Sequence, residues 1–122
     1  MKNGSAVGVM NKEIKKLWVT ALRSGEYKQG TKHLRTANQH GTRYCCLGVL
    51  SDLAVKAKAC TVKEAFTSPL ELLTPSVMKW AGLKTENPKI TKKYRLSAYN
   101  DGNDGCKQHS FAEIADLIEK KL

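Results

Sequence analysis

Cys46, Asp101 and His109 are the residue types from which a cysteine hydrolase builds its nucleophile, its orienting group and its base. Cys46 opens a stretch with helical periodicity, and the N–H groups and dipole at a helix start can lower the pKa of a thiol. The flanking signatures of known cysteine nucleophiles are absent, however, and cysteine is among the most often buried residue types. A buried core thiol is therefore the competing interpretation, and we rank the enzyme hypothesis below hypotheses of binding.

A second group of residues suits the binding of an anion. Guanidinium groups contact phosphates through two parallel hydrogen bonds, and tyrosine rings can stack on a nucleotide base. The residues expected to line such a surface are Arg23, Tyr27, Lys28, Arg35, Arg43 and Tyr44. Because the side chains of a strand alternate between two faces, only some of these groups can converge. The alternative is a solvated basic hairpin that binds nothing.

Metal and cofactor motifs are not found. The four cysteines and three histidines show neither the C-x-x-C nor the H-x-x-x-H spacing that preorganises two metal ligands. The chain also lacks the glycine-rich strings that bind nucleotide phosphates and the G-x-S-x-G string of serine hydrolases. We therefore expect no metal and no cofactor.

Positive charge dominates the chain and is concentrated in its first half. The 122 residues include 21 basic and 11 acidic side chains, for a net charge of +10. Residues 1–60 hold 11 basic and 3 acidic side chains, a difference of +8, which leaves +2 for residues 61–122. A field of this sign attracts phosphates and acidic protein surfaces. No run of apolar residues is long enough for a membrane helix, and we expect the cysteines to be free thiols in the cytoplasm.

Apolar periodicity predicts the helices that position these residues. Apolar side chains recur with helical spacing after Asn11, a candidate N-cap, and stop at Gly25. A nearly continuous apolar stripe over residues 46–57 predicts a buried central helix. A short helix is expected from Thr74-Pro75 to Gly82, and Ser110 with Glu113 has the spacing of a capping box for a last helix.

Turn signals and extended segments complete the expected architecture. Residues 38–41 look like the turn of a β-hairpin, residues 58–69 like an irregular excursion, and residues 94–99 like a short strand. The sequence thus predicts an α+β fold with three or four helices packed on a short antiparallel hairpin. We expect residues 1–10 to form a flexible arm and residues 11–122 a single domain.

Several blocks of the sequence resemble a family of small proteins found mainly in bacteriophage and prophage genomes. These blocks are ALRSGEYKQG at residues 21–30, YCCLGVL at 44–50, WAGL at 80–83, ND at 100–101 and SFAEIA at 110–115. They are spread over most of the chain. The resemblance implies a phage accessory protein that works in the host cell cytoplasm, and it carries over no catalytic residue.

Three functions remain open at this point. The first is a non-enzymatic inhibitor, which can be a homo-oligomer and which sequesters a phosphate-bearing ligand such as a defence signalling nucleotide through Arg23, Lys28, Arg35 and Arg43. The second is a basic protein that docks on an acidic host enzyme or on nucleic acid. The third is the cysteine hydrolase. A concave, partly apolar pocket would favour the small ligand, and a flat basic surface would favour a macromolecule.

Overall fold

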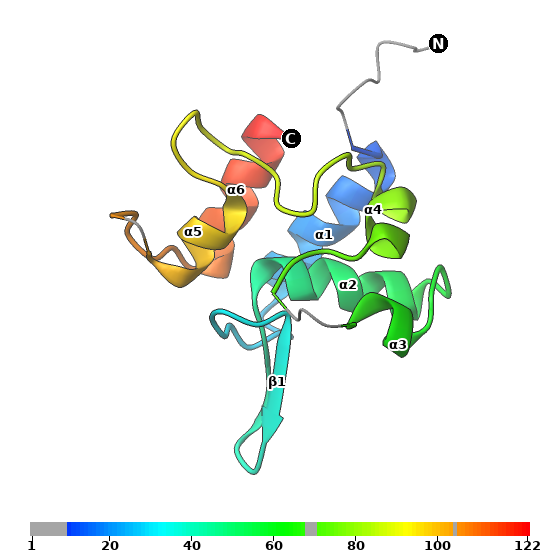
Figure 1. Cartoon of the computed structure of the whole chain (residues 1–122). Coiled ribbons are helices and arrows are strands. Elements are labelled where there is room, and N and C mark those ends of the chain that lie inside the picture. The colour runs from blue at the N-terminus through cyan, green and yellow to red at the C-terminus, as the bar shows by residue number, and fades with distance from the viewer. Residues whose placement is uncertain (1–9, 68–70, 104) are drawn as a thin grey trace, which may run out of the picture.

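Helix α2 (Cys46–Lys56) lies at the centre of the molecule, and the other helices pack around it (Figure 1). Cys46, Leu47, Val49 and Leu50 expose none of their surface. A helix that is apolar on all sides is stable only when it is buried on all sides, because each face removes apolar surface from water. The structure therefore confirms the buried central helix that the apolar stripe predicts.

The structure is a computed structural model that describes residues 10–67, 71–103 and 105–122. In these residues six helices accompany one two-stranded antiparallel sheet, so the fold class is α+β. The elements are α1 (Lys12–Ser24), β1 (Arg35–Asn38), β2 (Gly41–Tyr44), α2 (Cys46–Lys56), α3 (Val62–Ala65), α4 (Pro75–Ala81), α5 (Leu96–Asp101) and α6 (Phe111–Lys121). None of the helices in this part of the chain could cross a bilayer, since even the longest, α1, has only 13 residues.

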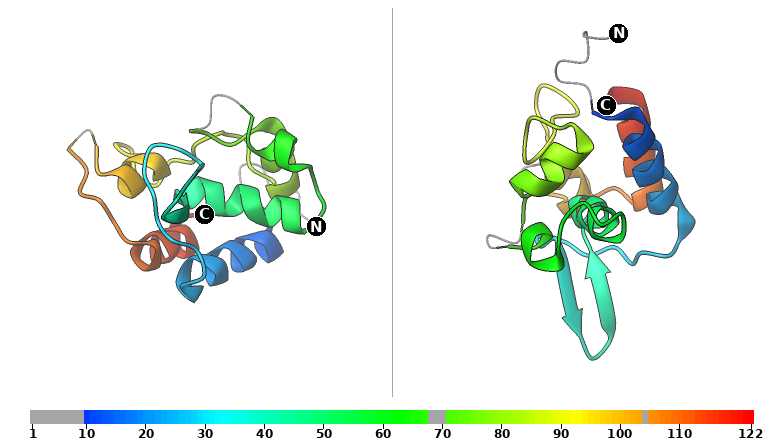
Figure 2. Two further views of the ribbon diagram at one scale, coloured as in Figure 1. Left: turned by 90° about the horizontal axis from the view of Figure 1, so that it is seen from below. Right: turned by 90° about the vertical axis from the view of Figure 1, so that its right-hand side faces the viewer.

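Helices α1 and α6 pack side by side and close one flank of the core (Figure 2). Asn11 caps α1 by accepting a hydrogen bond from the backbone N–H of Ile14 at 3.0 Å, and Gly25 ends the helix with a φ of 82°. Ser110 and Glu113 form a complete capping box at the start of α6. Both helices thus begin at the predicted residues, and α1 also ends at its predicted residue.

The β1–β2 hairpin projects away from the helices (Figures 1 and 2). Arg35 pairs with Tyr44 and Asn38 pairs with Gly41, so the two residues between Asn38 and Gly41 form the expected turn. Backbone bonds from Gly30 to Tyr44 and from Tyr44 to Lys28 hold the segment before β1 against the base of β2. The hairpin is thereby fixed to the body at one end only.

One of the expected segments is wrong, and another contains a short helix. Residues 94–99 form no strand, because Leu96–Asp101 is helix α5, which Gly102 ends with a φ of 72°. The expected irregular excursion contains α3, and its capping box joins Thr61 to Glu64. A buried run of four to six residues is apolar in a helix and in a strand alike, so periodicity does not separate the two.

The start of the packed domain also differs by one residue from the expected boundary. Met10 was expected in the arm, but it is only 2% exposed and lies in the core. The backbone N–H of Asn11 donates to the carbonyl oxygen of Ala81 at 2.8 Å, which fixes the start of α1 to the end of α4. The remainder of the expected arm, residues 1–9, lies outside the described residues.

Candidate functional site

Arg23, the first residue of the expected anion-binding surface, faces α6 instead of the hairpin. Its guanidinium donates to Asp116 at 2.6 Å and to Glu119 at 3.1 Å. Hydrogen bonds to Glu119 and Asp116 raise the pKa of the guanidinium above its ordinary value. The charge of Arg23 is therefore already partly balanced within the protein.

Arg35 and Arg43 lie on opposite faces of the hairpin. Residues that pair directly across an antiparallel sheet share a face, so Arg35 shares one face with Tyr44 and Arg43 shares the other with Thr36. The guanidinium of Arg35 lies 4.4 Å from the ring centroid of Phe66, and Arg43 donates to the carbonyl oxygen of Gln29 at 3.3 Å. These two arginines therefore cannot both contact the same small ligand.

The two tyrosines contact each other and are not free to stack on a base. Their rings meet edge to face at 5.0 Å, and the ammonium of Lys56 lies 5.0 Å from the centroid of Tyr27. The hydroxyl of Tyr27 donates to Asp52 and accepts from Lys56. Burial and the bond to Asp52 raise the pKa of Tyr27 to about 12. Tyr27 thus joins α2 to the loop that follows α1.

The structure consequently divides the six expected ligand-binding residues among separate places. Arg23, on α1, is bound to Asp116 of α6, Tyr27 and Tyr44 pack at the hairpin base, and the two other arginines lie on the two faces of the hairpin. Lys28 is exposed beside the same base, where its carbonyl oxygen accepts from the backbone N–H of Tyr44. The expected convergence on one surface is therefore wrong, because α6 and the strand pairing separate the cations.

The cysteine-hydrolase set is not assembled either. Cys46 has no exposed surface, and burial raises the pKa of its thiol well above the ordinary value. A buried neutral thiol is a poor nucleophile and out of reach of an external substrate. The ring of His109 packs edge-on against Tyr99, and its Nδ1 lies 2.6 Å from the carbonyl oxygen of Lys107. Cys46 is therefore a core thiol in this structure.

Asp101 and its neighbour Asn100 have a structural role that the sequence reasoning missed. The side-chain oxygen of Asn100 accepts from the backbone N–H of Cys46 at 3.0 Å and from the amide of Gln29 at 3.1 Å, and its amide donates to the carbonyl oxygen of Gly30. Asp101 accepts from the backbone N–H of Lys32 at 2.9 Å. These bonds fix the loop after α1 to α2 and α5. Their one sequence signal is the Asn-Asp block of the family resemblance.

A concave site with several cations lies elsewhere, between α1 and α6. This α1–α6 groove has a volume of about 490 Å³ and is lined by Lys12, Lys15, Lys16, Val19, Thr20, Arg23 and Glu119. No ion pair joins its three lysines to a carboxylate among the described residues, where only Arg23 and Lys56 form such pairs. The groove thus presents four cations and one carboxylate.

The helix α1 explains why these side chains share one groove. Lys12, Lys16, Val19 and Arg23 follow one another at intervals of three or four residues, so they form a stripe along one side of the helix. The sequence places these lysines away from the apolar face of the helix, but the ligand-binding residues predicted from it do not include them. The three- and four-residue spacing is a signal for this basic stripe. The contribution of α6 to the groove could not be predicted from the sequence of α1.

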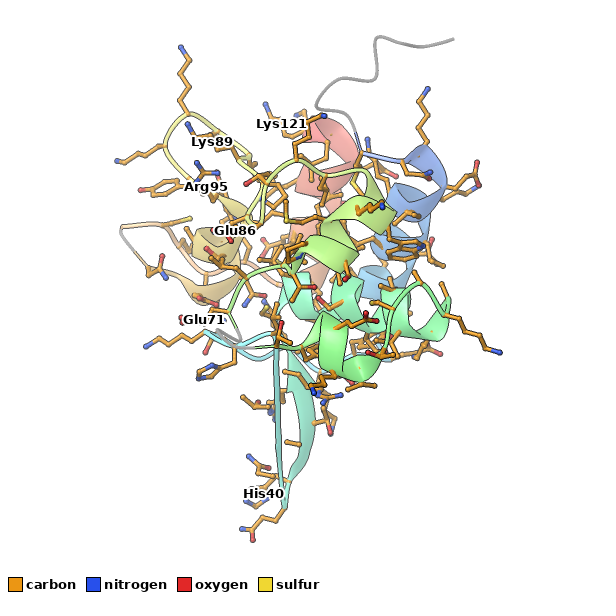
Figure 3. The ribbon with its side chains drawn as sticks, turned by 45° about the vertical axis from the view of Figure 1, so that its right-hand side comes forward. His40, Glu71, Glu86, Lys89, Arg95 and Lys121 are labelled. Atoms are coloured by element: carbon orange, nitrogen blue, oxygen red, sulfur yellow. The ribbon has the colours of Figure 1, made fainter. Side chains whose placement is uncertain are left out.

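Lysines also line a second, more open depression near the end of α6. It has a volume of about 530 Å³ and is lined by Lys89, Ile90, Thr91, Lys92 and Lys121. Lys89 and Lys121 lie together at the end of the molecule opposite the hairpin tip (Figure 3). In the residues that the structure describes, no three His, Cys, Asp or Glu side chains come close enough to hold a metal ion. Charge, not metal coordination, is thus the chemical character of this surface.

Residues 10–122 match the model of a protein family whose description is a domain of unknown function, DUF8296. The chain belongs to this family. Met10, where the DUF8296 match begins, is also the first residue that the structure describes, and it is buried in the core. No curated protein and no solved structure shows significant similarity to the chain. The function of this DUF8296 protein is therefore inferred from its basic surface grooves.

Proposed function

We propose that the protein binds a phosphate-bearing ligand of nucleotide size in the α1–α6 groove. The observation that carries this proposal is that Lys12, Lys15 and Lys16 line one concave volume without a carboxylate partner among the described residues. Like charges held close together raise each other's free energy, and a bound phosphate removes that cost. An anion is therefore the ligand class that this groove favours.

The size and composition of the groove suit a ligand that is only partly charged. Small-molecule sites have volumes of roughly 300 to 1,000 Å³ and combine apolar walls with a few polar groups. At about 490 Å³ the groove lies in this range, and Val19 and the lysine stems supply an apolar wall. The lysine ammonium groups would contact phosphates while a base or sugar packs on that wall.

The proposed activity is capture without chemistry. Cys46 is buried and Asp101 is hydrogen-bonded to the backbone of Lys32, so neither of these expected catalytic residues is placed for reaction. The resemblance of the sequence blocks to phage proteins supports a role as a phage accessory protein in the host cytoplasm. Sequestration of a host signalling nucleotide is the specific role that we propose.

A docking function on an acidic host protein is the second candidate. The observation that favours it is the second lysine-lined depression, which with the α1–α6 groove places basic side chains on both sides of the end of α6. An extended acidic surface could contact both depressions at once, whereas a nucleotide would occupy only one.

Isothermal titration calorimetry with ATP and with a cyclic dinucleotide tests the first candidate. Lys12→Gln/Lys16→Gln should weaken binding at least tenfold, because each charged hydrogen bond contributes about 1.5 to 3 kcal/mol. Lys63→Gln/Lys79→Gln removes the same charge from exposed positions on α3 and α4, and should have little effect. Native mass spectrometry of the purified protein reports the subunit count and any retained nucleotide.

Two results would contradict the proposal. No detectable binding of either nucleotide at millimolar concentration would remove the small ligand. Equal weakening by both double variants would show that only the net charge matters. Loss of capture of an acidic protein in Lys89→Gln/Lys121→Gln, without any nucleotide binding in the wild type, would favour the second candidate.

A further inference from the structure

We infer that the β1–β2 hairpin is a second binding element, which enters the major groove of duplex DNA. This inference does not rest on the proposed nucleotide site, because none of the residues that line the α1–α6 groove belongs to the hairpin. It follows from the exposure, the dimensions and the charge of the hairpin.

The hairpin does not serve the core of the protein. All eight residues from 36 to 43 are exposed, so their side chains remove little apolar surface from water. A two-stranded hairpin is marginal in isolation, and this one is held at its base by Arg35 on Phe66 and by Tyr44 on Tyr27. The helical body thus holds the hairpin in place, although the hairpin contributes little to the packing of the core.

The dimensions of the projection fit a major groove. Four residues per strand at about 3.4 Å each give a length of about 14 Å. The major groove of B-form DNA is about 12 Å wide and 8.5 Å deep, and it admits a two-stranded β-ribbon. A ribbon of this length could reach the floor of the groove while its base stays at the phosphates.

The basic side chains lie near the base of the hairpin and uncharged polar side chains lie at its tip, as docking in a DNA groove requires. The sequence has no acidic residue between Glu26 and Asp52, while this segment holds four basic ones, Lys28, Lys32, Arg35 and Arg43. Lys28, Arg35 and Arg43 lie at or beside the base, where phosphates would pass, and the backbone N–H of Lys32 donates to Asp101 of α5. Arg43 uses one N–H on Gln29 and Arg35 lies over a ring, so both retain free donors for a phosphate.

The end of the hairpin carries hydrogen-bonding groups and no carboxylate, and its one apolar side chain is the small methyl group of Ala37, which pairs with Thr42. Asn38, Gln39, His40 and Thr42 are all exposed, and His40 lies at the far end of the projection (Figure 3). Amide side chains can donate to and accept from base edges in the major groove. An apolar tip would have indicated a protein or membrane partner instead, so the polar tip selects the nucleic acid.

Duplex DNA is favoured over duplex RNA by the shape of the groove. The major groove of A-form RNA is deep and too narrow for protein elements to read. The protein should therefore bind a 16-base-pair DNA duplex more tightly than an RNA duplex of the same sequence. Fluorescence anisotropy at several salt concentrations measures both affinities.

The location is tested by nuclear magnetic resonance on the ¹⁵N-labelled full chain. Adding the 16-base-pair DNA duplex should shift the backbone amide signals of residues 36–43. Gln39→Ala changes no charge and should weaken DNA binding several-fold, and Arg43→Gln should lower the salt dependence by about one phosphate contact. Lys63→Gln/Lys79→Gln is the control for net charge.

Four results would overturn this inference. They are equal affinity for the RNA duplex, amide shifts that avoid residues 36–43, no effect of Gln39→Ala, or a dimer that buries the hairpin in the absence of DNA. Lys12→Gln/Lys16→Gln distinguishes the two proposals, because it should abolish nucleotide binding and leave the DNA-induced shifts of residues 36–43 in place.

Discussion

The carbonyl oxygen of Leu34 occupies the space that a side chain on Gly48 would need. A Cβ at Gly48 would lie 1.7 Å from that oxygen and 2.6 Å from the carbonyl carbon, both of which belong to the backbone. The same oxygen accepts the backbone N–H of Cys45 at 3.2 Å, so it cannot move without loss of that bond. Glycine is required here because the end of the loop and the start of α2 touch directly.

Gly48→Ala should therefore destabilise the protein by about 3 kcal/mol, at the upper end of overpacking effects. At an unhindered helical position the same change would stabilise the helix by roughly 1 kcal/mol. The free energy of unfolding in urea measures the result. A stabilised variant would show that Leu34 does not pack on α2 as described.

Asn100→Ala should also be strongly destabilising, although its side chain is polar. It is fully buried, so truncation leaves the buried N–H of Cys46 and the partly buried groups of Gln29 and Gly30 without its hydrogen bonds. Each such group costs about 1 to 3 kcal/mol. Urea unfolding should show a loss of at least about 2 kcal/mol. Asn103→Ala, at an exposed position, is the control and should have little effect.

The sequence predicted those elements whose cause is local. Asn11, Gly25 and the pair Ser110 and Glu113 fix the ends of α1 and α6 through bonds within three or four residues. Helix α5 was not predicted because its buried polar residue, Asn100, is hydrogen-bonded to partners 54 to 71 positions away in the chain. No local pattern records such partners.

The candidate site shows the same limit. The sequence pointed to the correct half of the chain for positive charge, but Arg23 is bound by Asp116 and Glu119, more than 90 residues later. Lys12, Lys15 and Lys16 line a groove only because α6 packs beside α1. The charge could be predicted, and its convergence could not.

Tyr27 should make stability depend on pH in the alkaline range. Its pKa is about 12 in the folded protein and 10.0 for an unperturbed tyrosine, so folding favours the neutral form. The stabilising contribution is complete below pH 10 and is lost as the pH rises towards 12. The difference in unfolding free energy between wild type and Tyr27→Phe should thus shrink from pH 9 to pH 11. The control variant Tyr94→Phe keeps Tyr27, so its unfolding free energy should change with pH as in the wild type.

Alkylation of the native protein should distinguish the thiol of Cys60 from those of Cys45 and Cys46. Burial raises the pKa of Cys45 to about 11 and that of Cys46 well above the ordinary range. Cys60 is only half-buried and should react first with iodoacetamide at pH 8. Peptide mass spectrometry should find Cys45 and Cys46 labelled only after unfolding in urea. Rapid labelling of native Cys46 would contradict its burial and restore the cysteine-hydrolase hypothesis.

Glu119→Gln should increase the affinity of the α1–α6 groove for ATP. Glu119 supplies the carboxylate that lines the groove, and it also binds the guanidinium of Arg23. Its neutralisation removes repulsion of the phosphates and releases Arg23 to contact them, while Asp116 still anchors the guanidinium at 2.6 Å. Because exposed charges contribute about 0.2 to 1 kcal/mol, we expect an increase of about 1.4- to fivefold by calorimetry. Asp116→Asn is the control, because it changes the net charge by the same amount. Asp116 also binds the guanidinium of Arg23, but it is not among the residues that line the groove. It should therefore raise the affinity less, and equal effects of the two variants would mean that ATP does not bind between α1 and α6.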